Sequence, residues 1–90
     1  MERVIVIYLT RQGCKTCEIV KPQASLITKK YGALFWEHDE KAQSLLCRLF
    51  NIRLYPAVLI FKNGWPVGCF QCHDLVEFKQ RLEKTLSEVV

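Results

Sequence analysis

No run of apolar residues in this sequence approaches the roughly 20 residues with which a helix crosses a membrane. The apolar block over residues 4–9 is short and has no small-residue cleavage site behind it, so it does not resemble a signal peptide. No linker, internal repeat or low-complexity tract divides the 90 residues. We therefore expect a cytoplasmic protein with a single domain over residues 1–90 and no membrane partner.

Concentrated charge is absent as well. The chain has 13 basic and 9 acidic residues, but the basic residues are scattered, and Lys29-Lys30 is their only adjacent pair. A nucleic-acid-binding surface would need a basic stripe with interleaved aromatic residues, so we expect no nucleic-acid partner. Half of the residues are apolar, which suffices for a packed core without metal or structural disulfides. We expect a monomer.

Cysteine is the residue type that stands out. The five cysteines are an odd number and no secretory signal accompanies them, so a disulfide scaffold is not indicated. In a reducing compartment, closely spaced cysteines are more often catalytic or metal-binding. Cys14 and Cys17 form one C-x-x-C motif, and Cys69 and Cys72 form a second.

Apolar periodicity and turn residues predict seven elements in the order β-α-β-α-β-β-α. The expected strands and helices are 4–9, 14–31, 33–36, 39–50, 57–61, 67–71 and 75–89. A parallel strand pair joined by a right-handed helical crossover, extended by a hairpin at Asn63-Gly64, gives a mixed four-stranded sheet. The predicted fold class is therefore α/β, with helices on both faces of the sheet in a three-layer sandwich.

Local signals refine this outline. Pro22 lies inside the first helix and should kink it, and Gly32 suits the end of that helix. Asp74 with Glu77 three residues later resembles a capping box at the start of the last helix. Trp36 is expected in the core, whereas Trp65 follows a turn and is expected at the surface.

Cys14 and Cys17 stand where a strand passes through a loop into a helix. The start of a helix carries unpaired N–H groups and the positive end of the helix dipole, and both stabilise a thiolate. Arg11 and Lys15 add positive charge, and the thiolate is the nucleophile of disulfide exchange. We therefore expect Cys14 to attack a partner disulfide and Cys17 to resolve the mixed disulfide. A buried structural pair or half of a zinc site is the alternative interpretation.

The second C-x-x-C motif, Cys69 and Cys72, gives weaker evidence for a functional site than the first. Residues three apart on a strand point to opposite faces, so a disulfide between Cys69 and Cys72 would need a bend. A zinc site joining the two motifs would span residues 18–68, far more than the usual spacing of roughly 15–20, and we expect no metal. Cys72 is either an auxiliary thiol beside the substrate groove, open to glutathionylation, or a small half-buried residue. Cys47 is expected in the core.

Several motifs together resemble those of the thioredoxin superfamily. Cys14 and Cys17 are similar to its C-x-x-C, Pro22 stands at the place of its helix-kinking proline, and Tyr55-Pro56 before an apolar strand is similar to its cis-proline segment. The resemblance spans nearly the whole chain and implies a thioredoxin-like fold. It also implies that Pro56 is cis and that the Tyr55 backbone faces Cys14 and pairs with a bound substrate.

Where the sequence departs from the thioredoxin pattern, several of its residues resemble glutaredoxins, but others do not. Tyr8 stands where thioredoxins usually carry a buried acid, and Tyr8, Arg11 and Cys14 are similar to the corresponding residues of glutaredoxins. No strand and helix precede the strand that leads to the motif, which also resembles glutaredoxins. Residues 54–55 and 70–74, however, differ from the segments with which glutaredoxins hold glutathione. The resemblance implies a small glutaredoxin-like fold with thioredoxin-like chemistry.

The leading hypothesis is a thiol–disulfide oxidoreductase that reduces or exchanges protein disulfides through Cys14 and Cys17. Its substrates would be disulfide-containing proteins, its electron donor a reductase or glutathione, and its only redox group the dithiol itself. Candidate substrate-binding residues are Tyr55, Pro56, Arg11, Lys15 and Cys72. The alternatives are a glutathione-dependent glutaredoxin, a non-enzymatic interaction module, and metal or iron–sulfur binding through the motif.

Overall fold

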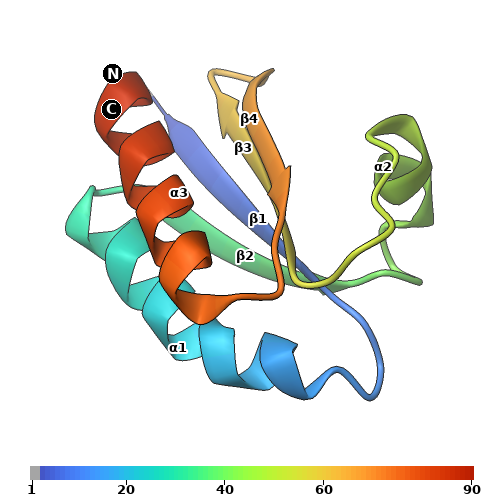
Figure 1. The fold of residues 1–90 in the computed structure, drawn as a ribbon. Helices are drawn as coiled ribbons and strands as arrows, with labels where there is room; N and C mark the ends of the chain where they lie inside the picture. The colour runs from blue at the N-terminus through green and yellow to red at the C-terminus, as the bar shows by residue number, and fades with distance from the viewer. Residues whose placement is uncertain (1–2) are drawn as a thin grey trace.

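The computed structural model describes residues 3–90, and Met1 and Glu2 lie outside the described residues. Its elements follow the predicted order β-α-β-α-β-β-α (Figure 1). They are β1 (Val4–Thr10), α1 (Lys15–Lys30), β2 (Leu34–Asp39), α2 (Ser44–Leu49), β3 (Ala57–Lys62), β4 (Trp65–Gln71) and α3 (Leu75–Val89). Helix α1 continues through Pro22 without a break. The three helices include none long and apolar enough, within residues 3–90, to span a membrane.

One mixed sheet of four strands in the order β2-β1-β3-β4 organises the molecule. Strand β1 is parallel to β2 and antiparallel to β3, and β3 is antiparallel to β4. In this register Tyr8 lies between Glu37 of β2 and Val58 of β3. The predicted α/β class and sheet type are confirmed.

The helices cover both faces of the sheet unequally, as Figure 1 shows. Helices α1 and α3 pack side by side on one face, and the short α2 lies on the other. Because strand side chains alternate between the two faces of the sheet, there is a hydrophobic core on each face. The larger core lies between the sheet and helices α1 and α3. Its fully buried members are Val6, Tyr8, Val20, Ala24, Val58, Ile60, Phe78, Leu82 and Leu86. The smaller core, on the α2 face, includes Leu9, Cys17, Cys47, Tyr55 and Leu59.

The hairpin between β3 and β4 turns at Asn63-Gly64, as predicted. Asn63 and Gly64 have φ angles of 53° and 87°, and two consecutive positive φ values fit the two-residue turn that matches strand twist. The Asn63 side-chain oxygen accepts a hydrogen bond from the Arg3 backbone N–H at 2.9 Å. This bond ties the turn to the chain just before β1.

Three local predictions were wrong. The second helix does not begin at Asp39 but at Ser44, because Asp39 accepts hydrogen bonds from the backbone N–H groups of Lys41, Ala42 and Gln43, which form turns instead. Asp74 stands at the start of α3, but its side chain makes no capping hydrogen bond. The predicted capping box is therefore absent.

Trp36 is not in the core. It lies on the edge strand β2 opposite Ile7, on the face that α2 covers. Because α2 has only six residues, it does not reach β2, and Trp36 is 46% exposed. Trp65 is exposed as predicted.

Candidate active site

Cys14 is the residue from which α1 begins. The loop from β1 closes with a hydrogen bond from the Cys14 N–H to the Arg11 carbonyl at 3.1 Å, and Gly13 supplies the positive φ of 80° that the loop requires. Cys14 takes an extended conformation and is the N-cap of α1. The Cys17 N–H donates to Cys14 Sγ at 3.1 Å. A sulfur therefore takes the place that a serine or aspartate oxygen fills at most helix starts.

Cys14 and Cys17 are joined by a disulfide, with their Cα atoms 5.3 Å apart. Cys14 is half-buried, whereas Cys17 is 3% exposed. One turn of helix thus separates a sulfur that a partner can reach from a sulfur that packs in the smaller core. The roles expected of the two cysteines would require this order of exposure, with the attacking sulfur accessible and the resolving sulfur inside.

The segment before β3 forms the wall opposite Cys14. The Tyr55–Pro56 peptide bond is cis, the isomer that the resemblance implied, and the Tyr55 carbonyl oxygen lies 3.9 Å from Cys14 Sγ. Both residues are buried. The Tyr55 ring reaches away from Cys14 towards Cys47 and Glu40, and burial, followed by Cys47 and Glu40, raises the pKa of its hydroxyl. Its backbone, not its ring, faces the dithiol.

Gln71, the last residue of β4, holds this segment in place. Its side-chain oxygen accepts hydrogen bonds from the backbone N–H groups of Arg53 and Leu54, each at 2.8 Å, and its side-chain nitrogen donates to the Asn51 carbonyl at 3.2 Å. Sequence analysis missed this residue. A glutamine at the end of a strand carries no motif, and 17 to 20 residues separate it from its partners.

Tyr8 lies beneath the dithiol. Its side chain is fully buried, and its hydroxyl donates to the Cys17 carbonyl at 2.7 Å. Burial raises the pKa of Tyr8, and the Glu37 carboxylate raises it further. The hydroxyl is therefore neutral at physiological pH and acts as a hydrogen-bond donor rather than as a base.

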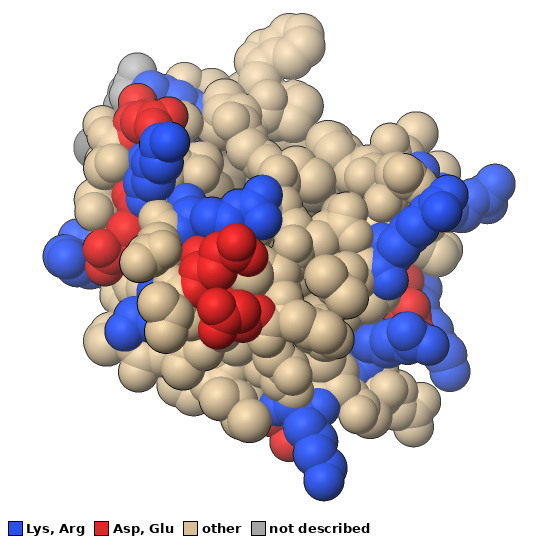
Figure 2. Space-filling model, viewed as in Figure 1, with Lys and Arg blue, Asp and Glu red and all other residues tan. Residues whose placement is uncertain are grey.

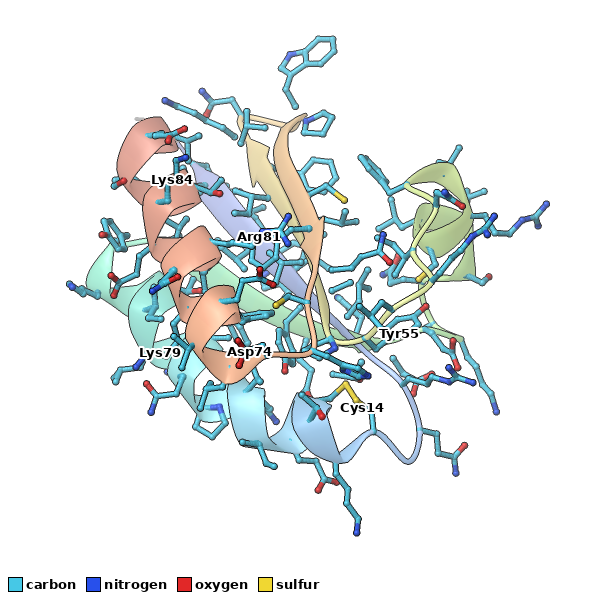
Figure 3. All side chains as sticks on the ribbon, in the orientation of Figure 1. Cys14, Tyr55, Asp74, Lys79, Arg81 and Lys84 are labelled. Atoms are coloured by element: carbon cyan, nitrogen blue, oxygen red, sulfur yellow. A yellow bond between two sulfur atoms is a disulfide. The ribbon has the colours of Figure 1, made fainter. Side chains whose placement is uncertain are left out.

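Arg11 and Lys15 are exposed on either side of Cys14 in the sequence. Both line a groove of about 440 Å³ that extends from Cys14 to Leu54 and Tyr55, and His73 lines it as well. In Figure 3 Cys14 lies at the start of α1, between the loop that leads into α3 and the segment that carries Tyr55. The structure therefore brings four of the five expected substrate-binding residues to one end of the sheet.

Cys72 is the expected site residue that the structure places elsewhere. It is 2% exposed and belongs to the larger core, where its thiol donates to Glu77 Oε2 at 2.9 Å and to the Asp74 carbonyl at 3.3 Å. Burial and the Glu77 hydrogen bond raise the pKa of this thiol. The Cys72 backbone N–H donates to the Pro56 carbonyl at 3.2 Å. Of the two interpretations of Cys72, the structure agrees with the small residue that packs inside the protein rather than with a thiol beside the substrate groove, because its side chain turns into the core.

The remaining cysteines are unpaired. Cys47 is buried in the smaller core, as predicted, and Cys69 is exposed on β4. Over residues 3–90, no three His, Cys, Asp or Glu side chains gather closely enough to hold a metal ion.

Comparison with known proteins gives matches at the level of structure. Neither a family model nor a curated protein sequence matches the chain. The thioredoxin pre-protein of Schistosoma mansoni superposes with a TM-score of 0.80 at 22% identity, over 98% of this chain and 80% of its own. Fasciola hepatica thioredoxin gives 0.77 at 18% identity, over 98% and 82%. A malarial protein gives 0.75 at 19% identity, over 98% of both chains. The chain has the thioredoxin fold.

Proposed function

We propose that this protein is a thiol–disulfide oxidoreductase that acts on protein disulfides through Cys14 and Cys17. The observation that carries the proposal is the Cys14–Cys17 disulfide at the start of α1, opposite the cis Tyr55–Pro56 bond. A reachable sulfur and a buried sulfur within one turn are the two groups that disulfide exchange requires. The thioredoxins with a similar fold are consistent with this chemistry.

The reaction begins with the reduced form. The Cys14 thiolate attacks one sulfur of a partner disulfide, a bond forms between the two sulfurs, and the second partner sulfur leaves as a thiolate. The Cys17 N–H, which lies 3.1 Å from Cys14 Sγ, stabilises the attacking thiolate, as does the helix dipole. Lys15 and Arg11 add positive charge nearby.

Cys17 completes the exchange. Its thiolate attacks Cys14 Sγ, which re-forms the Cys14–Cys17 disulfide and releases the first partner sulfur as a thiolate. The partner gains two electrons and two protons, and the protein loses the same number. We propose that a dithiol reductase or glutathione then reduces the disulfide, in a reducing compartment such as the cytoplasm, where the free thiols of Cys47, Cys69 and Cys72 persist.

Reduction of insulin disulfides with dithiothreitol as donor tests the proposal. The protein should accelerate the reaction above the rate with dithiothreitol alone, and Cys14→Ser should abolish the acceleration. Cys17→Ser should accumulate a mixed disulfide with the substrate, which mass spectrometry detects. Cys69→Ser is the matched control, because Cys69 is exposed and unpaired on β4, and it should keep full activity.

Two outcomes would contradict the proposal. Full activity in Cys14→Ser would show that another group performs the exchange. No turnover by the unmodified protein, with a Cys14 pKa near the ordinary value of about 8.5, would identify a binding module that uses the same groove without chemistry.

A further inference from the structure

Two grooves flank the dithiol, and their charges differ. The larger, of about 860 Å³, extends from Cys14 and Cys17 along α1 to β2. Its charged lining residues are Arg11, Lys21, Lys29, Glu18, Glu37 and Asp39. Three are basic and three are acidic, and Lys21 Nζ and Glu37 Oε1 are 2.8 Å apart. This side of the dithiol is therefore electrically balanced.

The groove on the Tyr55 side of Cys14 is not balanced. The ionisable side chains that line it, apart from Cys14 and Tyr55, are Arg11, Lys15, Arg53 and His73, and no carboxylate does so. Arg11 is partly compensated, since its Nε lies 3.9 Å from Glu40. Lys15 and Arg53 form none of the ion pairs found within residues 3–90. Two full positive charges at least are thus left for a ligand.

The basic side chains of this groove lie on three separate segments. Lys15 begins α1, Arg53 precedes the cis Pro56, and His73 precedes α3. The Arg53 guanidinium rests on a neutral group, because its Nε donates to Asn51 Oδ1 at 3.1 Å, and Gln71 fixes the backbone of the same segment. The Arg53 guanidinium is therefore positioned before a partner binds.

Figure 2 shows most of the visible acidic side chains over α3, next to Lys and Arg side chains, and a few more among the Lys and Arg side chains at the right-hand and lower margins. None of the acidic side chains of residues 3–90 lines the groove on the Tyr55 side of Cys14. Asp74, the acid nearest to His73 in sequence, is not among the residues that line the groove. The carboxylate of Glu40 lies close by, since it pairs with Arg11 and interacts with Tyr55, but it does not line the groove. A groove lined by basic and not by acidic side chains attracts negative partners and repels positive ones.

We propose that the disulfides this protein exchanges belong to acidic polypeptide segments, with Asp or Glu side chains on both sides of the cysteine that Cys14 attacks. This inference rests on the disulfide exchange proposed above and names its substrate class. Because the basic groups come from three segments around Cys14, they fit a chain with carboxylates at several positions better than a single small anion.

Three synthetic peptides test the inference, each a disulfide-linked dimer with Glu, Gln or Lys on both sides of its cysteine. The reduced protein should exchange with the Glu peptide about three- to tenfold faster, in kcat/KM, than with the Gln peptide, and slowest with the Lys peptide. The preference should fade as salt rises from about 0.01 M to about 1 M, since the screening length falls from about 30 Å to about 3 Å.

Matched charge deletions locate the effect. Arg53→Gln and Lys15→Gln should each lower the ratio of the Glu rate to the Gln rate. Lys84→Gln removes the same charge from an exposed position on α3, distant from Cys14 in Figure 3, and should leave the ratio unchanged. An equal fall in the ratio with Lys84→Gln would show a general charge effect and overturn the groove assignment.

The remaining outcomes separate this inference from the proposed function. Equal rates with all three peptides would overturn the inference and leave the oxidoreductase intact. No exchange with any peptide would refute the oxidoreductase itself. Oxidised glutathione provides the last comparison, because faster turnover of this small anionic disulfide than of the Glu peptide would overturn the assignment to a polypeptide.

Discussion

At the scale of single residues, Tyr8 stands where the pattern that this chain resembles usually has a buried acid. A buried acid there would accept the proton of the resolving cysteine. Tyr8 instead donates to the Cys17 carbonyl at 2.7 Å, and burial and Glu37 raise its pKa. A neutral hydroxyl holds the first turn of α1 on the sheet but takes no proton. If Cys17 is the resolving sulfur of the proposed exchange, Tyr8 is not the group that takes its proton.

Replacing Tyr8 with phenylalanine should destabilise the protein by about 0.5–1.5 kcal/mol, the usual contribution of one hydrogen bond. The ring remains and keeps its contacts with Phe35 and Phe78, so the change isolates the hydroxyl. Urea unfolding of the oxidised protein measures the difference. Tyr31→Phe is the control, since the Tyr31 hydroxyl makes none of the hydrogen bonds found in residues 3–90. Equal midpoints for the two variants would show that the Tyr8 hydroxyl contributes nothing.

At the scale of elements, the site is an assembly of segment ends. The end of β1 leads to Cys14, the start of β3 follows Pro56, and the end of β4 supplies Gln71, which fastens residues 51–54 to the sheet. The hydrogen bonds of one side chain therefore set the position of the wall that faces Cys14.

Gln71→Leu should release this wall. Without the side-chain oxygen, the backbone N–H groups of Arg53 and Leu54 lose their acceptor, and their hydrogen exchange should become about fivefold faster or more, since each lost bond is worth roughly 1 kcal/mol. Amide exchange followed by NMR measures this directly. Gln80→Leu, on the exposed side of α3, should change neither amide. Unchanged exchange at Arg53 and Leu54 in Gln71→Leu would contradict the clamp.

The same scale shows what sequence patterns can and cannot predict. The stripe Phe78, Leu82 and Leu86 predicted α3 and its buried face, because helical periodicity determines which side chains share a face. Glu77 matched a capping box by spacing, yet its carboxylate accepts from Cys72. Trp36 was predicted in the core, but the burial of a strand residue depends on the neighbouring strands and on whether a helix covers that face of the sheet. The local spacing of residues therefore does not predict contacts between segments that are distant in the sequence.

For the dithiol, local spacing was enough. A strand, a short loop and a helix follow one another along the chain, so the sequence alone places Cys14 at a helix start and Cys17 one turn inside. The cis wall came from the resemblance, and the charge of the groove came only from the structure, because Lys15, Arg53 and His73 are far apart in the sequence and meet through the fold.

At the scale of the whole molecule, two buried tyrosines make folding stability depend on pH. Burial raises the pKa of Tyr8, with help from Glu37, and raises that of Tyr55, with help from Cys47 and Glu40. In the unfolded chain both hydroxyls titrate near the ordinary value of about 10. Below that pH the tyrosine hydroxyls stay protonated in both the folded and the unfolded protein, and the folded protein keeps its full free energy of unfolding.

As the pH rises above about 10, the unfolded chain releases these protons and the folded protein does not, so the free energy of unfolding should fall. The limiting slope is about 1.4 kcal/mol per pH unit for each tyrosine. Urea midpoints of the oxidised protein between about pH 8 and pH 11 measure the decline. Tyr8→Phe should make it shallower, because one of the groups whose pKa is raised by folding is gone, whereas Tyr31→Phe should follow the unmodified protein. If all three proteins lose stability in parallel, Tyr8 is not among the groups that cause alkaline unfolding, and its hydroxyl must be accessible to water.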